Sequence, residues 1–172
     1  LYFIMTVYKE MEGHSEDVII EKRLMRSNKE FGLWTKSVPI DVVLPDNQTD
    51  FNLAGISSNG RTFYLSVGEG YDFDIYECEE HEFRVVFKRK LDFINTKFYE
   101  SRVHFSRNGK AVYFTSNKPS GYGGLDIYKA VRSKSGKWRK PENLGSVINT
   151  RYNEESPFYD EDNNTLHFSS DG

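Results

Sequence analysis

Short runs of alternating apolar and polar residues recur along the whole chain, and they predict β-strands. The clearest set is residues 101–106, 111–115 and 126–131, followed by a fourth strand around Trp138 that leads to Leu144. These runs are rich in Val, Ile, Tyr and Phe, which favour strands, and Gly, Asn or Pro residues lie between them. No segment has a sustained 3.6-residue period, so we expect almost no helix.

The sequence repeats itself with a period of about fifty residues. Gly109-Lys-Ala-Val-Tyr-Phe114 corresponds to Gly60-Arg-Thr-Phe-Tyr-Leu65, and Asp126-Ile-Tyr128 corresponds to Asp74-Ile-Tyr76. The alignment predicts a second set of four strands at residues 53–57, 62–66, 74–78 and 83–88. The repeated positions that we expect to be structural are Asp17, Asp74, Asp126, Gly60, Gly109, Trp34 and Trp138.

The alignment divides one domain, residues 1–172, into four repeat units. These units are residues 1–45 (partial), 46–93, 94–147 and 148–172 (partial). Because the chain starts inside one unit and stops inside another, we interpret it as a piece of a longer protein.

The fold class that these units predict is all-β, and the predicted architecture is a β-propeller of four-stranded antiparallel blades. A β-sandwich is the alternative, but a sandwich does not require the sequence to repeat itself blade by blade. Propellers have about four to eight blades. A little over three repeat lengths would therefore give an incomplete ring.

The two ends of each predicted unit differ in loop length. At one end, Asn59-Gly60 and Asn108-Gly109 predict tight hairpin turns with positive φ at both central residues. The other end collects longer segments, namely residues 9–16, 67–73 and 117–125 between second and third strands, and crossovers at 46–51, 95–100 and 149–155. Binding residues are often carried on loops held by a rigid scaffold.

Exposed aromatic residues and arginines are the usual anchors of an interface. The candidate partner-binding residues on the long loops are therefore Tyr71, Tyr122, Arg151 and Tyr152. The alternative is that these side chains only pack the turns.

Other candidate chemistry has a structural explanation. The aspartates that open the third strands can accept loop N–H groups as Asx caps, whereas calcium needs more convergent oxygen ligands. Gly121-Tyr-Gly-Gly124 precedes a strand, which does not fit a phosphate loop. Glu100, Glu154 and Glu155 are interpreted as solvated charges, with ligands at a channel mouth as the alternative. We expect no catalytic residue, no cofactor and no metal.

Composition narrows the function classes further. The net charge of -3 does not favour nucleic acid, which a basic domain would bind. The single cysteine, Cys78, cannot form an internal disulfide and gives no metal-ligand spacing. No apolar run reaches the length of a membrane span, so we expect none in this segment.

Several motifs are specific enough to indicate a family. Ser106-Arg-Asn-Gly109, followed by Tyr-Phe-Thr-Ser and Asp-Ile-Tyr, resembles the WD40-like repeat called PD40 of TolB-like propellers. The longer signature of Gly121-Tyr-Gly-Gly-Leu-Asp-Ile-Tyr128, Trp138-Arg-Lys-Pro-Glu-Asn-Leu-Gly145 and Asn153-Glu154 is similar to that of OmpA-family envelope proteins of Bacteroidota. The first unit departs from this pattern, because Asp17-Val-Ile lacks the tyrosine.

This resemblance implies a non-catalytic protein-interaction scaffold in the bacterial cell envelope, in the periplasm or at the outer membrane. It implies an OmpA-family context or one of type IX secretion and gliding, with envelope proteins as partners. One alternative is a propeller that binds glycan or peptidoglycan through exposed Tyr and Trp. Another is the propeller domain of a hydrolase, either an oligopeptidase or a glycosidase.

Overall fold

The fold is described from a computed structural model. The structure describes residues 1–9, 18–45, 48, 50–70 and 72–172. Two residues that were singled out from the sequence, Asp17 and Tyr71, lie outside this set. Every regular element in the described residues is a β-strand, and every strand pair within the sheets is antiparallel. The predicted all-β class is therefore confirmed.

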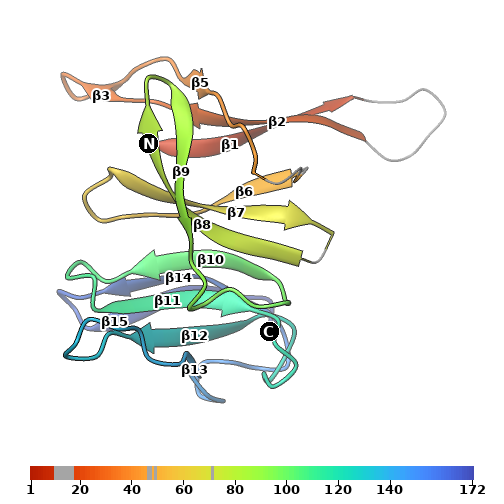
Figure 1. Cartoon of the computed structure of the whole chain (residues 1–172), viewed down its shortest axis with the longest axis vertical. Coiled ribbons are helices and arrows are strands. Elements are labelled where there is room, and N and C mark those ends of the chain that lie inside the picture. Colours follow the sequence, from red (N-terminus) through yellow and green to blue (C-terminus); the bar gives the residue numbers. More distant parts are fainter. Residues whose placement is uncertain (10–17, 46–47, 49, 71) are drawn as a thin grey trace.

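The first sheet lies at one end of the long axis of the molecule (Figure 1). It contains β1 (Tyr2–Lys9), β2 (Val18–Arg26) and β5 (Val38–Ile40), in that order. A separate hairpin of β3 (Lys29–Glu30) and β4 (Leu33–Trp34) projects from the chain between β2 and β5.

The second sheet is a four-stranded meander, because its strands pair in the order in which they occur in the chain. They are β6 (Asp50–Ile56), β7 (Thr62–Glu69), β8 (Asp72–His81) and β9 (Arg84–Lys90). The meander follows from local sequence: strand-forming runs are separated by short turns, so each strand pairs with the next one along the chain.

The third and fourth sheets continue the same order. The third is β10 (Glu100–Phe105), β11 (Ala111–Ser116), β12 (Asp126–Val131) and β13 (Glu142–Asn143), and the fourth pairs β14 (Glu154–Asp160) with β15 (Thr165–Ser170). The predicted fourth strand around Trp138 is reduced to an isolated bridge with Arg132, and the regular pairing comes later, at β13. Lys137-Trp-Arg-Lys-Pro141 interrupts the ladder there, since proline has no N–H to donate.

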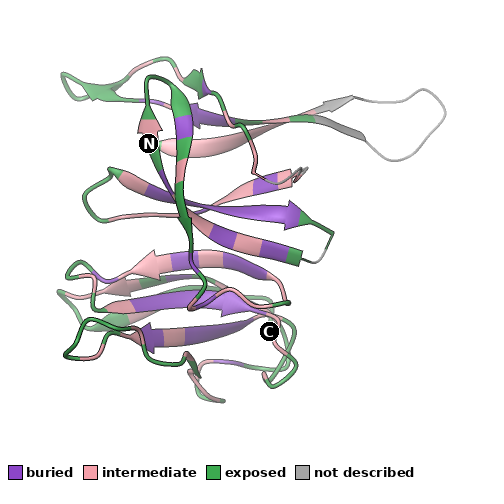
Figure 2. Cartoon of the chain, viewed as in Figure 1, coloured by how far each residue is buried: buried purple, intermediate pink, exposed green. Residues whose placement is uncertain are grey.

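The sheets pack face to face, and the core lies between them. One apolar cluster joins the first and second sheets through Leu24, Ile40 and Phe63, and another joins the second and third through Ile75 and Phe114. Figure 2 shows β7 and β11 as mostly buried strands. By contrast, the side chains of β15 are largely exposed.

The turns between the first two strands differ from the sequence prediction. Positive φ occurs at Gly60 and Gly109 but not at the asparagines before them. The Gly109 N–H donates to the Ser106 carbonyl 2.8 Å away, which closes a β-turn one residue earlier than predicted. Because the Asn108 side chain accepts hydrogen bonds from the Ser106 hydroxyl and the Lys110 N–H, the asparagine stabilises the turn without a left-handed backbone.

The two tryptophans of the repeat motif also occupy different places. Trp138 stacks on Phe93 with 4.4 Å between ring centroids and pairs with Arg132. Trp34 lies on the projecting β3–β4 hairpin, and Val38 is the residue that pairs with Arg26 in the first sheet. A hairpin inserted before Val38 explains why matching tryptophan to tryptophan gave the wrong register.

The crossovers between sheets are tied down by a repeated asparagine. The Asn95 side chain accepts a hydrogen bond from the Ile75 N–H and donates one to the Ile75 carbonyl, both at 2.9 Å. Asn149 does the same to Ile127 at 2.8 and 3.0 Å. Each asparagine side chain therefore forms hydrogen bonds with the backbone of the third strand of the preceding sheet, as a neighbouring strand would.

The residue that follows each crossover corrects another prediction. Glu100 and Glu154, interpreted from the sequence as solvated charges, are both fully buried. The Glu100 carboxylate accepts hydrogen bonds from the Thr96 N–H and hydroxyl and from the Ser116 hydroxyl. Glu154 accepts the matching three bonds from Thr150 and Ser170. These carboxylates hold the crossover against the first two strands of the next sheet.

Candidate interaction site at the loop end

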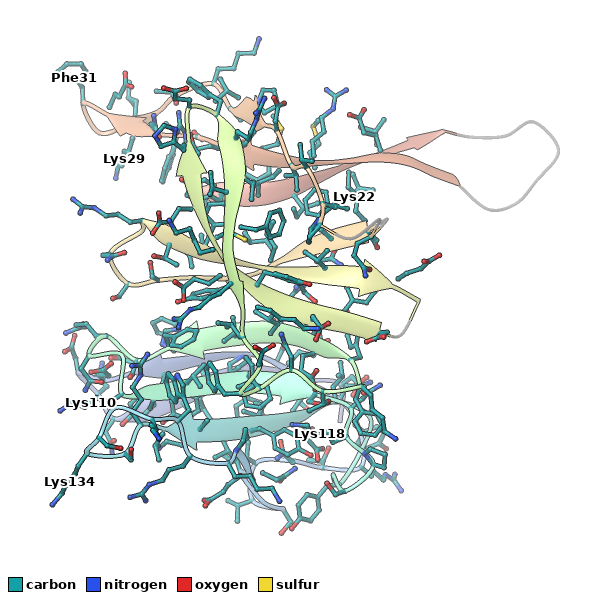
Figure 3. All side chains as sticks on the ribbon, viewed as in Figure 1. Lys22, Lys29, Phe31, Lys110, Lys118 and Lys134 are labelled. Carbon is teal, nitrogen blue, oxygen red and sulfur yellow. The ribbon has the colours of Figure 1, made fainter. Side chains whose placement is uncertain are left out.

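The loop between β11 and β12 and the crossovers into the third and fourth sheets lie at one end of the sheets (Figure 1), as predicted, and we call this the loop end. In Figure 3, Lys118 marks the loop end, while Phe31, Lys110 and Lys134 mark the opposite end with its short turns. The crossover into the fourth sheet lies directly on the loop between β11 and β12, because the Gly124 N–H donates to the Tyr152 carbonyl at 3.0 Å.

Asp126 holds the loop that carries Tyr122. Its buried carboxylate accepts hydrogen bonds from the Tyr122 N–H at 2.6 Å and the Gly123 N–H at 3.2 Å, as the Asx-cap prediction requires. Asn143 on β13 donates a third bond at 2.7 Å. The loop is thereby fixed to the third sheet on both sides of the tyrosine.

Glycine is required where this loop meets the crossover. A Cβ at Gly123 would lie 2.2 Å from the Tyr152 carbonyl oxygen, and one at Gly121 would lie 2.1 Å from an Asp126 carboxylate oxygen. Real Cβ atoms do not approach backbone oxygen so closely. Gly123 is therefore explained by close packing of two backbones and Gly121 by the position of the Asp126 carboxylate, so no ligand is needed to account for them.

Arg151 and Tyr152 lie on the crossover beside that loop. The Arg151 guanidinium stacks over the Tyr152 ring at 4.8 Å and donates to its hydroxyl at 2.7 Å. Tyr152 is 41% exposed and Tyr122 is 53% exposed. We call Tyr122, Arg151 and Tyr152 the loop-end patch. The structure brings these three predicted residues onto one surface, and their role in binding stays a prediction.

A cleft of about 470 Å³ beside the patch was not predicted from the sequence. It is lined by Asp50, Asn52, Gly70, Phe73, Tyr99, Asn117, Gly124, Leu125 and Asn153. Phe73 packs edge-on against Tyr99 with 5.3 Å between centroids, and Lys22 forms an ion pair with Asp50 at 2.6 Å. Its lining comes from two strands of the second sheet and from loops and crossovers that are distant in sequence, so no local motif could have revealed it.

Among the described residues, Asp74 has a different partner from those of Asp126. It forms an ion pair with Lys90 at 2.5 Å, and the pKa of Lys90 is raised, chiefly by this hydrogen bond. The register explains the change of partner: Tyr76 pairs with Lys90 in the second sheet, and Tyr128 pairs with Asn143 in the third. The same position on the fourth strand thus reaches the aspartate in both sheets.

The described residues contain no group of three or more His, Cys, Asp or Glu side chains placed to hold a metal ion. His104 packs on Phe158, and its ring nitrogen lies 3.2 Å from the Tyr159 carbonyl, while burial lowers its pKa. Burial also raises the pKa of Cys78 to about 12, so its thiol is not activated.

The described part of the chain has no helix that is long and apolar enough to cross a bilayer.

Comparison with known proteins adds no relative. No family model, curated protein or solved structure matches this chain.

Proposed function

We propose that the chain is part of a β-propeller whose loop end recruits an envelope protein without catalysing a reaction. The sheet order supports the propeller, because each sheet is a meander and its first strand lies beside that of the next: β6, β10 and β14 are neighbours. Gly55 on β6 approaches β10 so closely that a Cβ would lie 2.1 Å from the Val103 carbonyl oxygen. First strands that crowd together in this way are expected around a propeller axis.

The loop-end patch is the observation that carries the function. Two aromatic side chains and one arginine lie exposed on backbones that are held by Asp126 and by the crossover contacts. Rigid aromatic and arginine anchors lose little entropy on binding, and they dominate many interfaces. With the PD40 and OmpA-family resemblance, this supports a scaffold in the periplasm or at the outer membrane.

A quantitative pull-down from bacterial envelope extract tests the proposal. We expect proteins retained by the wild-type chain to be reduced at least tenfold by Tyr122→Ala and by Tyr152→Ala, since hot-spot aromatics contribute about 2 kcal/mol or more.

Arg107→Ala is the matched control, because Arg107 is exposed at the opposite end, where it pairs with Asp162. It should retain the same proteins as the wild type. Equal retention by all three variants, with unchanged circular dichroism spectra, would contradict the proposal.

A second candidate function is supported by the cleft rather than by the patch. Its aromatic pair and its Asn52 and Asn117 amides suit a neutral, hydroxyl-rich ligand such as a glycan, because Lys22 already neutralises Asp50. A glycan array that shows binding lost in Asn117→Ala but kept in Tyr122→Ala would favour this function over the protein scaffold.

A further inference from the structure

The β3–β4 hairpin carries the most exposed group of large apolar side chains in the described part of the chain. Phe31 is fully exposed, Leu33 is 76% exposed and Trp34 is 58% exposed. Phe31 extends into solvent at the end of the hairpin (Figure 3). Single exposed apolar residues are ordinary, but three within four consecutive positions mark an interaction site.

The turn at the tip makes Phe31 more unusual still. Glu30 pairs with Leu33, and the two residues between them have positive φ, 50° for Phe31 and 84° for Gly32. A two-residue turn of this kind favours Asn or Asp before the glycine, and bulky residues rarely adopt positive φ. Phe31 therefore costs free energy in both its backbone conformation, which the turn requires, and its hydration, which the turn does not require.

The hairpin is rigidly attached to the first sheet. The Thr35 N–H donates to the Asn28 carbonyl at 2.8 Å, and the Ser27 hydroxyl donates to the Thr35 carbonyl at 2.7 Å. The apolar tip is thus held away from the sheet by hydrogen bonds at its base. It cannot be described as a loop that has merely failed to pack.

The distribution of the apolar side chains identifies the environment that suits them. Leu33 and Trp34 are consecutive strand residues, so their side chains point to opposite faces of the hairpin. With Phe31 at the tip, the hairpin carries one exposed apolar side chain on each face and one at its end, with Glu30 opposite Leu33 and Lys29 opposite Trp34. A flat protein partner would cover one face only, whereas the boundary between lipid headgroups and acyl chains surrounds an inserted tip on all sides.

Two lysines at the base of the hairpin fit the same environment, and they outnumber its one carboxylate, Glu30. Lys29, on β3, lies over the Trp34 ring at 5.9 Å, and Lys36 comes two residues after the end of β4. Tryptophan is favoured at the headgroup level of bilayers, and lysines near the surface are attracted to anionic lipids. We propose that the β3–β4 hairpin inserts Phe31, Leu33 and Trp34 into the interface of a phospholipid bilayer that contains anionic lipids.

Vesicle binding by the whole chain tests this proposal. Vesicles of phosphatidylcholine with phosphatidylglycerol should sediment the protein and shift Trp34 emission to the blue. In a Trp34→Phe variant the remaining emission comes from Trp138, which is stacked on Phe93. Subtracting this emission from that of the wild type gives the signal of Trp34. Phe31→Ser combined with Leu33→Ser should weaken the partition constant at least tenfold, and Lys29→Glu with Lys36→Glu should remove the preference for phosphatidylglycerol.

Val147→Ser is the control, because Val147 is a highly exposed apolar residue outside the hairpin, and it should bind vesicles like the wild type. Absence of sedimentation and of a Trp34 shift would overturn the proposal, as would equal losses in the hairpin and control variants. A wild-type dimer that Phe31→Ser converts to monomer would also overturn it, by assigning the hairpin to a second copy of the chain.

Discussion

The second and third sheets pair their first two strands in a similar register, yet one equivalent pair of residues near the start of the first strand has different chemistry. In the second sheet Phe51 lies opposite Val67, and both are buried. In the third sheet Glu100 lies opposite Ser116, and both of these residues are buried as well. The fourth sheet repeats the polar version with a glutamate opposite a serine.

The crossover sequence accounts for this difference. Ile94-Asn-Thr96 and Ile148-Asn-Thr150 precede the two sheets with buried glutamates, whereas no Ile-Asn-Thr precedes Phe51. The threonine N–H and hydroxyl point at this position, and the buried carboxylate accepts their hydrogen bonds, without which its burial would be costly. The first residue of this pair is therefore buried in all three sheets, and the sequence of the preceding crossover determines whether it is polar or apolar.

Removing the asparagine that fixes the crossover should have the largest effect. Asn149→Ala leaves the buried Ile127 N–H without its partner and removes one of two donors to the Ile127 carbonyl, so we expect unfolding free energy to fall by about 2–4 kcal/mol. Urea denaturation would measure the change. Asn163→Ala, in the exposed β14–β15 turn, should change stability by less than about 0.5 kcal/mol. Similar losses in both variants would remove Asn149 from its structural role.

A smaller difference in stability is expected between losing the Asn143–Asp126 contact and losing the Lys90–Asp74 contact. Asn143→Leu deprives the buried Asp126 carboxylate of a donor and should cost about 1–3 kcal/mol. Lys90→Met removes a largely solvent-screened ion pair with Asp74 and should cost about 0–1 kcal/mol. Thermal melts at low and high salt would separate them, because only the Lys90 effect should shrink as salt rises. A larger loss in Lys90→Met would reverse the comparison.

The two buried glutamates should respond to pH in opposite directions. Burial raises the pKa of Glu100, despite the opposing hydrogen bonds from Ser116 and Thr96. Burial also acts to raise the pKa of Glu154, but hydrogen bonds from Thr150 and Ser170 outweigh it and the pKa is lowered. The exposed side chains of β15 explain this, since Glu154 is less deeply surrounded by protein.

The sign of each effect follows from proton linkage. With a raised pKa, native Glu100 binds more protons than the unfolded chain, so its contribution to stability falls as pH rises above about 4.3. Glu154 has a lowered pKa, so its contribution is lost as pH falls below about 4.3. Relative to wild type, Glu100→Gln should gain stability from pH 4 to 7, and Glu154→Gln should gain it toward acid. Parallel pH profiles for the two variants would show that the sites are electrostatically alike.

The sequence was a good guide to the strands and a poorer guide to buried polar chemistry. Residues 111–116 and 126–131 form strands as the alternation predicts, because Val, Ile and aromatic side chains pack on both faces there. Glu100 looked solvated since a linear pattern shows neither the threonine four residues earlier nor Ser116 as its partners. Hydrogen bonds of that kind depend on how the crossover turns back.

The candidate site was predicted only in part, because some of its features also depend on contacts between residues that are distant in sequence. Loop length indicated the end of the sheets where the long loops lie, and composition selected Tyr122 and Tyr152, which the structure leaves exposed. The cleft beside Tyr99 was missed because strands of the second sheet and loops distant in sequence form its walls. Trp34 was assigned to the repeat because residue identity was matched where an inserted hairpin had changed the register.

Site-specific photocrosslinking is the most direct test that the loop end is the binding face. A photoreactive phenylalanine derivative would replace Tyr122, Tyr152 or Arg107 in turn, and each chain would be irradiated in living cells. The account predicts that the first two positions give the same protein adduct and that Arg107, at the opposite end, gives none. Adducts at Arg107 alone, or no adduct at either tyrosine while the chain is folded, would contradict it.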